Sequence, residues 1–163
     1  MAAAVSPAVT SHRPPTVWTT IGVLMFLGGT ALAGGIALVL GVGAAPPGDW
    51  LHRIPVIDSW VVPGLVLGAG FGVGSLLAAY GMLRRSHWTW SRPIERVTRH
   101  HWSWIATMLL GLGHLAWIVV ELAYLPQVSA LQAVYGAVGV ALLLLPLHPA
   151  VRGYLAIDAG SRR

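Results

Sequence analysis

Cysteine, lysine and acidic residues are absent or scarce in this chain of 163 residues. Without cysteine there can be no disulfide bonds, thiolate metal sites or cysteine nucleophiles. All ten basic residues are arginine, only five residues are acidic, and charged residues make up 9% of the chain. A soluble domain carries about 25% charged residues. Because 56% of the residues are hydrophobic, the composition predicts a protein whose main solvent is lipid.

Four apolar segments are long enough to cross a bilayer, which takes roughly 20 residues in a helix. They cover residues 16–42, 60–83, 102–125 and 128–147. The sequence therefore predicts an all-α membrane protein, a four-helix transmembrane bundle forming a single domain over residues 16–155. We expect residues 1–15 to be a disordered N-terminal tail and residues 156–163 to be a basic C-terminal tail.

The arginines give the bundle an orientation. Only Arg53 lies between the first and second spans, whereas nine arginines lie on the other side: Arg13, Arg84, Arg85, Arg92, Arg96, Arg99, Arg152, Arg162 and Arg163. The positive-inside rule then places both termini and the basic loop between spans two and three in the cytoplasm, with the loop between spans one and two outside. The orientation predicts a multi-pass membrane protein, and the use of arginine without lysine together with abundant alanine, glycine and valine is typical of a high-GC bacterial genome, so we expect a bacterial cytoplasmic membrane. At the cytoplasmic face the arginines would contact anionic lipid headgroups, and no nucleic acid is expected as a partner.

A row of glycines marks the second span. Gly64, Gly68 and Gly72 recur every four residues and so share one helix face. Small residues let membrane helices approach closely, so this row predicts packing against another span, most simply the first. Two other interpretations remain open: a surface for a second copy or another membrane protein, and a groove for a lipid tail.

Polar residues inside the third and fourth spans form the candidate site. Glu121 is the one acid within a span, where a carboxylate is costly and is by default a functional candidate. Helical spacing puts His114 on the same face, and an antiparallel hairpin brings Gln132 to the depth of Glu121, within hydrogen-bonding reach. The predicted seam, which opens outward, consists of His114, Trp117, Glu121, Tyr124, Gln132 and Tyr135. These residues either hold two helices together through hydrogen bonds or form a ligand-binding or proton-relay site.

Further histidines and loop residues lie near the membrane boundaries. In the outer loop, His52, Arg53 and Asp58 are expected to come down near Glu121. At the opposite boundary, His100 or His101 could face His148, as a haem or metal would require. We expect interfacial histidines instead, with no cofactor and no metal, and the sequence assigns no catalytic residue.

Two stretches resemble a group of small four-span integral membrane proteins of bacterial, actinobacterial type that have no assigned activity. They are Ile54–Leu67 running into Gly70, Gly72 and Gly74, and the closing part with Glu121, Ser129, Ala130, Leu131, Gln132, Tyr135 and Gly136. The resemblance covers about residues 17–155 and implies the topology alone.

Three functions are compatible with these patterns. The first is a small accessory, assembly or interaction subunit, because glycine rows and short loops offer packing surface. The second is a binder or carrier of a lipid-like or small apolar ligand in an outward-opening pocket inside the bundle. The third is a membrane enzyme with a proton relay through His114 and Glu121. A closed contact at the seam would favour the first function, and a lined pocket would favour the others.

Overall fold

A computed structural model of the protein describes residues 13–43, 48, 51, 57–86, 88–124 and 129–157. Four of its helical segments are long and apolar enough to cross a membrane: Pro15–Leu40, Val61–Arg84, Trp102–Tyr124 and Ala130–Leu147. Their ends agree with those of the predicted spans to within two residues. The prediction of an all-α, four-helix transmembrane bundle is confirmed, and the chain is a multi-pass membrane protein.

The spans are built from the following elements. The first is helix α1 (Pro15–Leu40), and the third is α5 (Trp102–Tyr124). The second joins α2 (Val61–Leu65), the π-helix η2 (Val66–Val73) and α3 (Gly74–Arg84). The fourth joins α6 (Ala130–Leu144) to a short 3₁₀ turn, η4 (Leu145–Leu147). Outside the spans lie η3 (Thr89–Ser91), α4 (Arg92–Thr98) and α7 (Pro149–Leu155).

Helix α1 has a start and a stop that the sequence explains. Pro15 occupies its first position, where the missing N–H costs nothing. Gly41 follows its last residue in the left-handed conformation with φ of 65°, and its N–H bonds to the carbonyl of Ala37. Glycine adopts this conformation without strain and commonly ends a helix.

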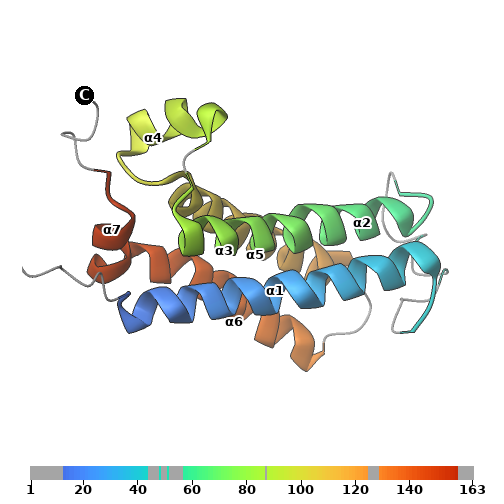
Figure 1. Ribbon diagram of the computed structural model, residues 1–163. Helices are drawn as coiled ribbons and strands as arrows, with labels where there is room; N and C mark the ends of the chain where they lie inside the picture. The colour runs from blue at the N-terminus through green and yellow to red at the C-terminus, as the bar shows by residue number, and fades with distance from the viewer. Residues whose placement is uncertain are drawn as a thin grey trace, which may run out of the picture.

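One end of the bundle gathers the beginning of α1, the end of α3, α4 and α7 (Figure 1). We call it the arginine-rich end, after Arg13, Arg84, Arg85, Arg92, Arg96, Arg99 and Arg152. There Arg13 donates hydrogen bonds to the Tyr154 hydroxyl at 3.1 Å and to the Leu83 carbonyl at 2.7 Å, and His100 pairs with Ala156 in an isolated β-bridge. These contacts tie together four segments that are distant in sequence. Residues 1–12 and 158–163 of the two predicted tails lie outside the described residues.

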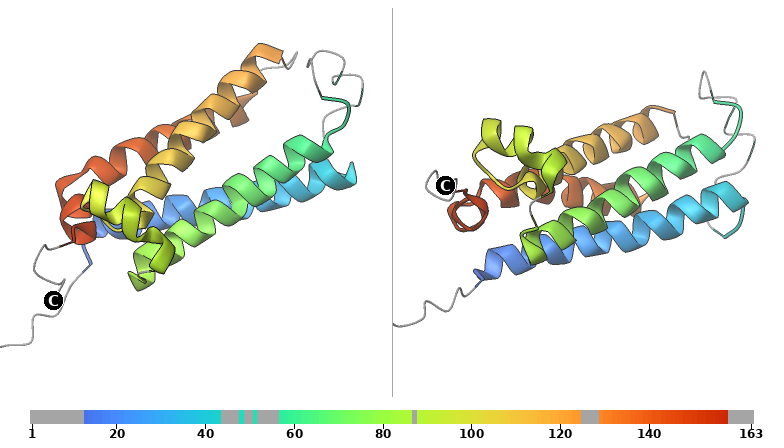
Figure 2. Two further views of the ribbon diagram at one scale, coloured as in Figure 1. Left: turned by 90° about the horizontal axis from the view of Figure 1, so that it is seen from above. Right: turned by 45° about the horizontal axis from the view of Figure 1, so that its top comes forward.

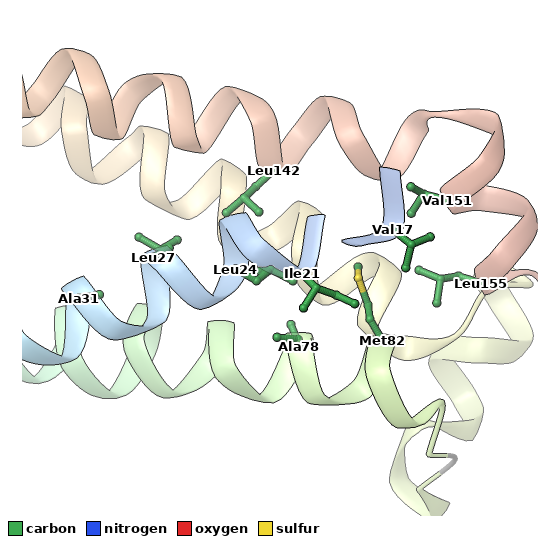
Figure 3. Packing of buried hydrophobic residues seen from close by; sticks show 11 residues of the cluster. Val17, Ile21, Leu24, Leu27, Ala31, Ala78, Met82, Leu142, Val151 and Leu155 are labelled. Carbon is green, nitrogen blue, oxygen red and sulfur yellow. The ribbon is translucent and has the colours of Figure 1, made fainter. Parts of the chain in front are cut away.

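The spans form two pairs, α1 with the second span and α5 with α6. The pairs meet near the arginine-rich end and diverge toward the opposite end, which we call the far end (Figure 2, left). The main core lies where they meet: Val17, Ile21, Leu24 and Leu27 of α1 pack with Met82 of α3, Leu142 of α6, and Val151 and Leu155 of α7 (Figure 3). The bundle is therefore held most tightly at one end.

The predicted glycine row packs against α1. A Cβ built on Gly64 would lie 2.8 Å from the Gly35 carbonyl oxygen, and one on Gly72 would lie 2.8 Å from the Leu32 side chain. The tightest position is Gly35 itself, where a Cβ would lie 2.6 Å from Gly64 O and from Gly68 Cα. Since no Cβ fits at that spacing, the close approach of these helices depends on glycine on both sides.

Candidate ligand pocket between α1, α5 and α6

The site is built on one face of α5. His114, Trp117 and Glu121 follow one another at helical spacing, and Glu121 stands one turn before the last residue of the helix, Tyr124. His114 lies ten residues before Tyr124, a rise of about 15 Å. The face therefore runs from the middle of the bundle to its far end.

His114 is buried, with 2% of its surface exposed, and neither ring nitrogen has a hydrogen-bond partner. Its ring is held between two aromatic side chains in edge-to-face contacts. The ring centroid of Phe71 lies 5.3 Å away and that of Tyr135 lies 5.7 Å away. Aromatic contacts fix the ring without satisfying its nitrogens, and an unpaired buried polar group costs about 1–3 kcal/mol.

Glu121 is half-buried and accepts a hydrogen bond from the indole of Trp117. The distance from Trp117 Nε1 to Glu121 Oε1 is 2.6 Å, which is short for an N–H donor. Trp117 in turn makes an edge contact with Phe71, with ring centroids 6.1 Å apart. The indole thus fixes the direction of the carboxylate near the far end.

These side chains line a partly open pocket of about 240 Å³ between α1, α5 and α6. The wall from α1 is mostly small and apolar. The lining residues are Leu27, Thr30, Ala31, Gly34, Ala37, Leu38, Leu67, His114, Trp117, Ile118, Glu121, Leu131 and Tyr135. Leu131 has 64% of its surface exposed, so the pocket reaches the outer surface of α6. Toward the arginine-rich end, α1 contacts α6 through the stacked rings of Phe26 and Tyr135, whose centroids lie 6.1 Å apart.

This chain matches no known protein family, no curated protein and no solved structure. Its function must therefore be argued from its own residues.

The structure brings together four of the six residues in the predicted seam: His114, Trp117, Glu121 and Tyr135 all line the pocket. The expected hydrogen bond between Glu121 and Gln132 is replaced by other contacts, and this prediction is corrected. Gln132 Oε1 instead accepts from the backbone N–H and the hydroxyl of Ser129, which closes a capping box at the start of α6. Tyr124 is exposed at the end of α5 and is not part of the described lining.

Of the three outer-loop candidates, only Asp58 lies among the described residues. Asp58 is exposed just before the second span and does not line the pocket. His52 and Arg53 lie outside the described residues, so the expectation that they approach Glu121 stays a prediction.

The histidines near the arginine-rich end take part in local hydrogen bonds. His101 Nδ1 lies 2.8 Å from the Ser103 hydroxyl and Nε2 lies 3.0 Å from the Ser86 carbonyl. His100 Nδ1 bonds to the Thr98 carbonyl at 2.6 Å, and His148 Nδ1 accepts the N–H of Ala150. In the part of the chain that the structure describes, no group of three or more histidines and acids is placed to hold a metal ion.

Sequence reasoning missed Phe71 and the α1 wall. Phe71 sits in the π-helix η2, where hydrogen bonds run from residue i to i+5, so ordinary helical spacing misplaces its side chain. The wall of Ala31, Gly34 and Ala37 belongs to a strip of small residues in the first span. That strip signals close packing in a membrane helix, and only the divergence of the helix pairs turns it into the side of a pocket.

Proposed function

We propose that this protein binds and holds or carries a small lipid-like molecule in the pocket between α1, α5 and α6. The observation that carries the proposal is His114: it lines the pocket, is almost fully buried, and has two unpaired ring nitrogens. A polar group on a ligand would supply a partner for one of them. The remaining lining is predominantly apolar, as is usual for small-molecule sites, in which a few polar groups fix the orientation.

The size and position of the pocket favour a ligand that arrives from the bilayer. Its volume of about 240 Å³ is below the roughly 300–1,000 Å³ typical of sites that enclose a whole ligand. It therefore suits a headgroup and the first carbons of a chain. Exposed Leu131 of α6 and Leu38 of α1 both line the pocket. The rest of the ligand's hydrocarbon chain would pass beside them into the surrounding lipid.

The two competing functions have less support. The glycine row that favoured an assembly subunit is used within the chain, in the contact between α1 and the second span. A proton relay needs His114 and Glu121 to be connected, yet the described hydrogen bond of Glu121 goes to Trp117 and His114 makes none.

We assign the protein to a bacterial cytoplasmic membrane, with the arginine-rich end in the cytoplasm. The clustering of nine of the ten arginines on one side of the spans supports this orientation. Exposed Arg92, Arg96 and Arg99, with exposed Trp90 beside them, support contact with anionic lipid headgroups at that face.

The test is a thermal shift in detergent with ω-brominated undecanol as the probe. We expect the wild-type protein to be stabilised in a saturable way, because a ligand that binds only the folded state raises the melting temperature. The variant His114→Phe keeps an aromatic ring between Phe71 and Tyr135 but removes both nitrogens, and it should lose this stabilisation.

Leu109→Ala is the matched control, since Leu109 lies on α5 with an exposed side chain and does not line the pocket. It should respond to the probe like the wild type. An equal response of His114→Phe and the wild type would overturn the proposal.

A further inference from the structure

The charges around the pocket are of one sign. Glu121 contributes a carboxylate, and the described lining residues include no arginine and no lysine. Thr30 adds a hydroxyl that already donates to the Phe26 carbonyl of its own helix at 2.8 Å. A ligand headgroup in this pocket would therefore meet the Glu121 carboxylate, the hydroxyls of Thr30 and Tyr135 and an imidazole, and no fixed cation among the described lining residues.

An anionic headgroup fits this arrangement poorly. At His114 it would be surrounded by apolar walls with no arginine or lysine to pair with, and burying an unpaired charge is costly. It would also lie two helical turns, about 10 Å along the axis, from the carboxylate of Glu121. At that separation and an effective dielectric constant near 20, like-charge repulsion lowers affinity on the order of tenfold.

A hydroxyl headgroup fits the same arrangement well. An imidazole that carries one proton offers one donor and one acceptor, and a hydroxyl can either accept from the first or donate to the second. It brings no charge that the apolar walls of Ala31, Gly34 and Ile118 would have to accommodate. A hydroxyl at His114 is also neutral toward Glu121, so no repulsion arises.

We propose that the ligand is a single-chain lipid alcohol, whose hydroxyl bonds His114, and that Glu121 at the rim of the pocket discriminates against fatty acids and other anionic lipids. This inference rests on the proposed function, since it specifies the ligand class of the same pocket. Selection of this kind combines an attractive contact for one headgroup with a repulsive one against its competitor. Glu121 is then a specificity-determining residue, and His114 is the contact for the headgroup.

The experiment compares three probes that share one hydrocarbon chain and differ in the headgroup. They are ω-brominated undecanol, ω-brominated undecanoic acid and the methyl ester of that acid, and binding is compared at a pH where the acid is ionised. Binding is measured as the saturable melting-temperature shift of the full chain in detergent. We expect the wild type to bind the alcohol at least tenfold more tightly than the acid. The ester, which is neutral but has no hydroxyl, should bind more weakly than the alcohol.

Two variants test whether Glu121 is the residue that discriminates against the acid. Glu121→Gln keeps an oxygen for the Trp117 N–H and removes the charge, so the affinity for the acid relative to that for the alcohol should rise about tenfold. Asp58→Asn is the control, because Asp58 is an exposed acid near the far end that does not line the pocket; its probe preferences should equal those of the wild type.

The outcomes separate the two proposals. If the wild type binds the acid as tightly as the alcohol and both shifts vanish in His114→Phe, the inference fails and the proposed function stands. If no probe gives a saturable shift in the wild type, the proposed function fails. If Glu121→Gln does not fold, the comparison of the alcohol, acid and ester on the wild type still decides the headgroup preference.

Discussion

Two buried histidines of this protein differ in one respect that decides what each does. His101 is fully buried and both its ring nitrogens lie within 3.0 Å of a polar partner, Ser103 or Ser86. His114 is buried to nearly the same degree and has none. A satisfied histidine stabilises the fold, whereas an unsatisfied one destabilises it unless something else supplies the hydrogen bonds.

Replacing each of these histidines with phenylalanine should therefore have opposite effects on the unliganded protein. His101→Phe removes the partner of the buried Ser103 hydroxyl, whereas the Ser86 carbonyl still accepts the Trp102 indole N–H at 3.0 Å. The loss should cost about 1–3 kcal/mol. His114→Phe removes an unpaired polar ring and should leave stability unchanged or raise it. Melting temperatures in detergent without added lipid provide the measurement. A clear loss of stability in His114→Phe would show that its nitrogens have partners inside the protein.

At the scale of elements, the contact between α1 and the second span is set by glycine on both helices. The consequences of adding one methyl group differ along α1 because the neighbours differ. At Gly35 the added atom would meet the backbone of Gly64 and Gly68 at 2.6 Å, and at Gly29 it would meet nothing within 4 Å. Backbone cannot move aside as a flexible side chain can, so the helices themselves would have to separate.

We expect Gly35→Ala to destabilise the bundle by about 1–3 kcal/mol, the usual cost of overpacking. Gly29→Ala, on the same helix, should be neutral or stabilising by up to about 1 kcal/mol, because alanine is the better helix former. Chemical or thermal unfolding in detergent compares the two. Equal stability of the two variants would mean that α1 does not lie against the second span at this distance.

At the scale of the whole molecule, the two helix pairs meet at the arginine-rich end and diverge at the far end (Figure 2, left). The main core and the contacts of Arg13 and α7 lie at the first end, whereas the pocket lies in the half toward the second. The closed end stabilises the bundle, and the pocket lies where the two helix pairs diverge.

The orientation of the bundle in the membrane can be measured by labelling introduced cysteines, because the chain has no cysteine of its own. We expect a cysteine introduced at exposed Ser59, at the far end, to react with a membrane-impermeant maleimide on intact cells. One introduced at Val97 in α4, which is 85% exposed, should react only after the membrane is permeabilised. The reverse pattern would invert the orientation derived from the arginines.

The sequence by itself determined the four spans and the face shared by His114, Trp117 and Glu121. Both follow from short-range patterns: hydropathy summed along about 20 residues, and helical spacing within one segment. The capping role of Gln132 could also have been read from the sequence, because Ser129 and Gln132, three residues apart, have the pattern of a capping box.

Only the tertiary structure decided that these residues line a pocket. The π-helix brings Phe71 against His114, the divergence of the helix pairs leaves space beside them, and α1 supplies the opposite wall. In lipid, hydrophobicity alone does not dictate which apolar face meets which, because tails and side chains are equally apolar. The pairing of helices is therefore set by shape, through contacts such as Gly35 with Gly64 and Gly68, which depend on residues far apart in the chain.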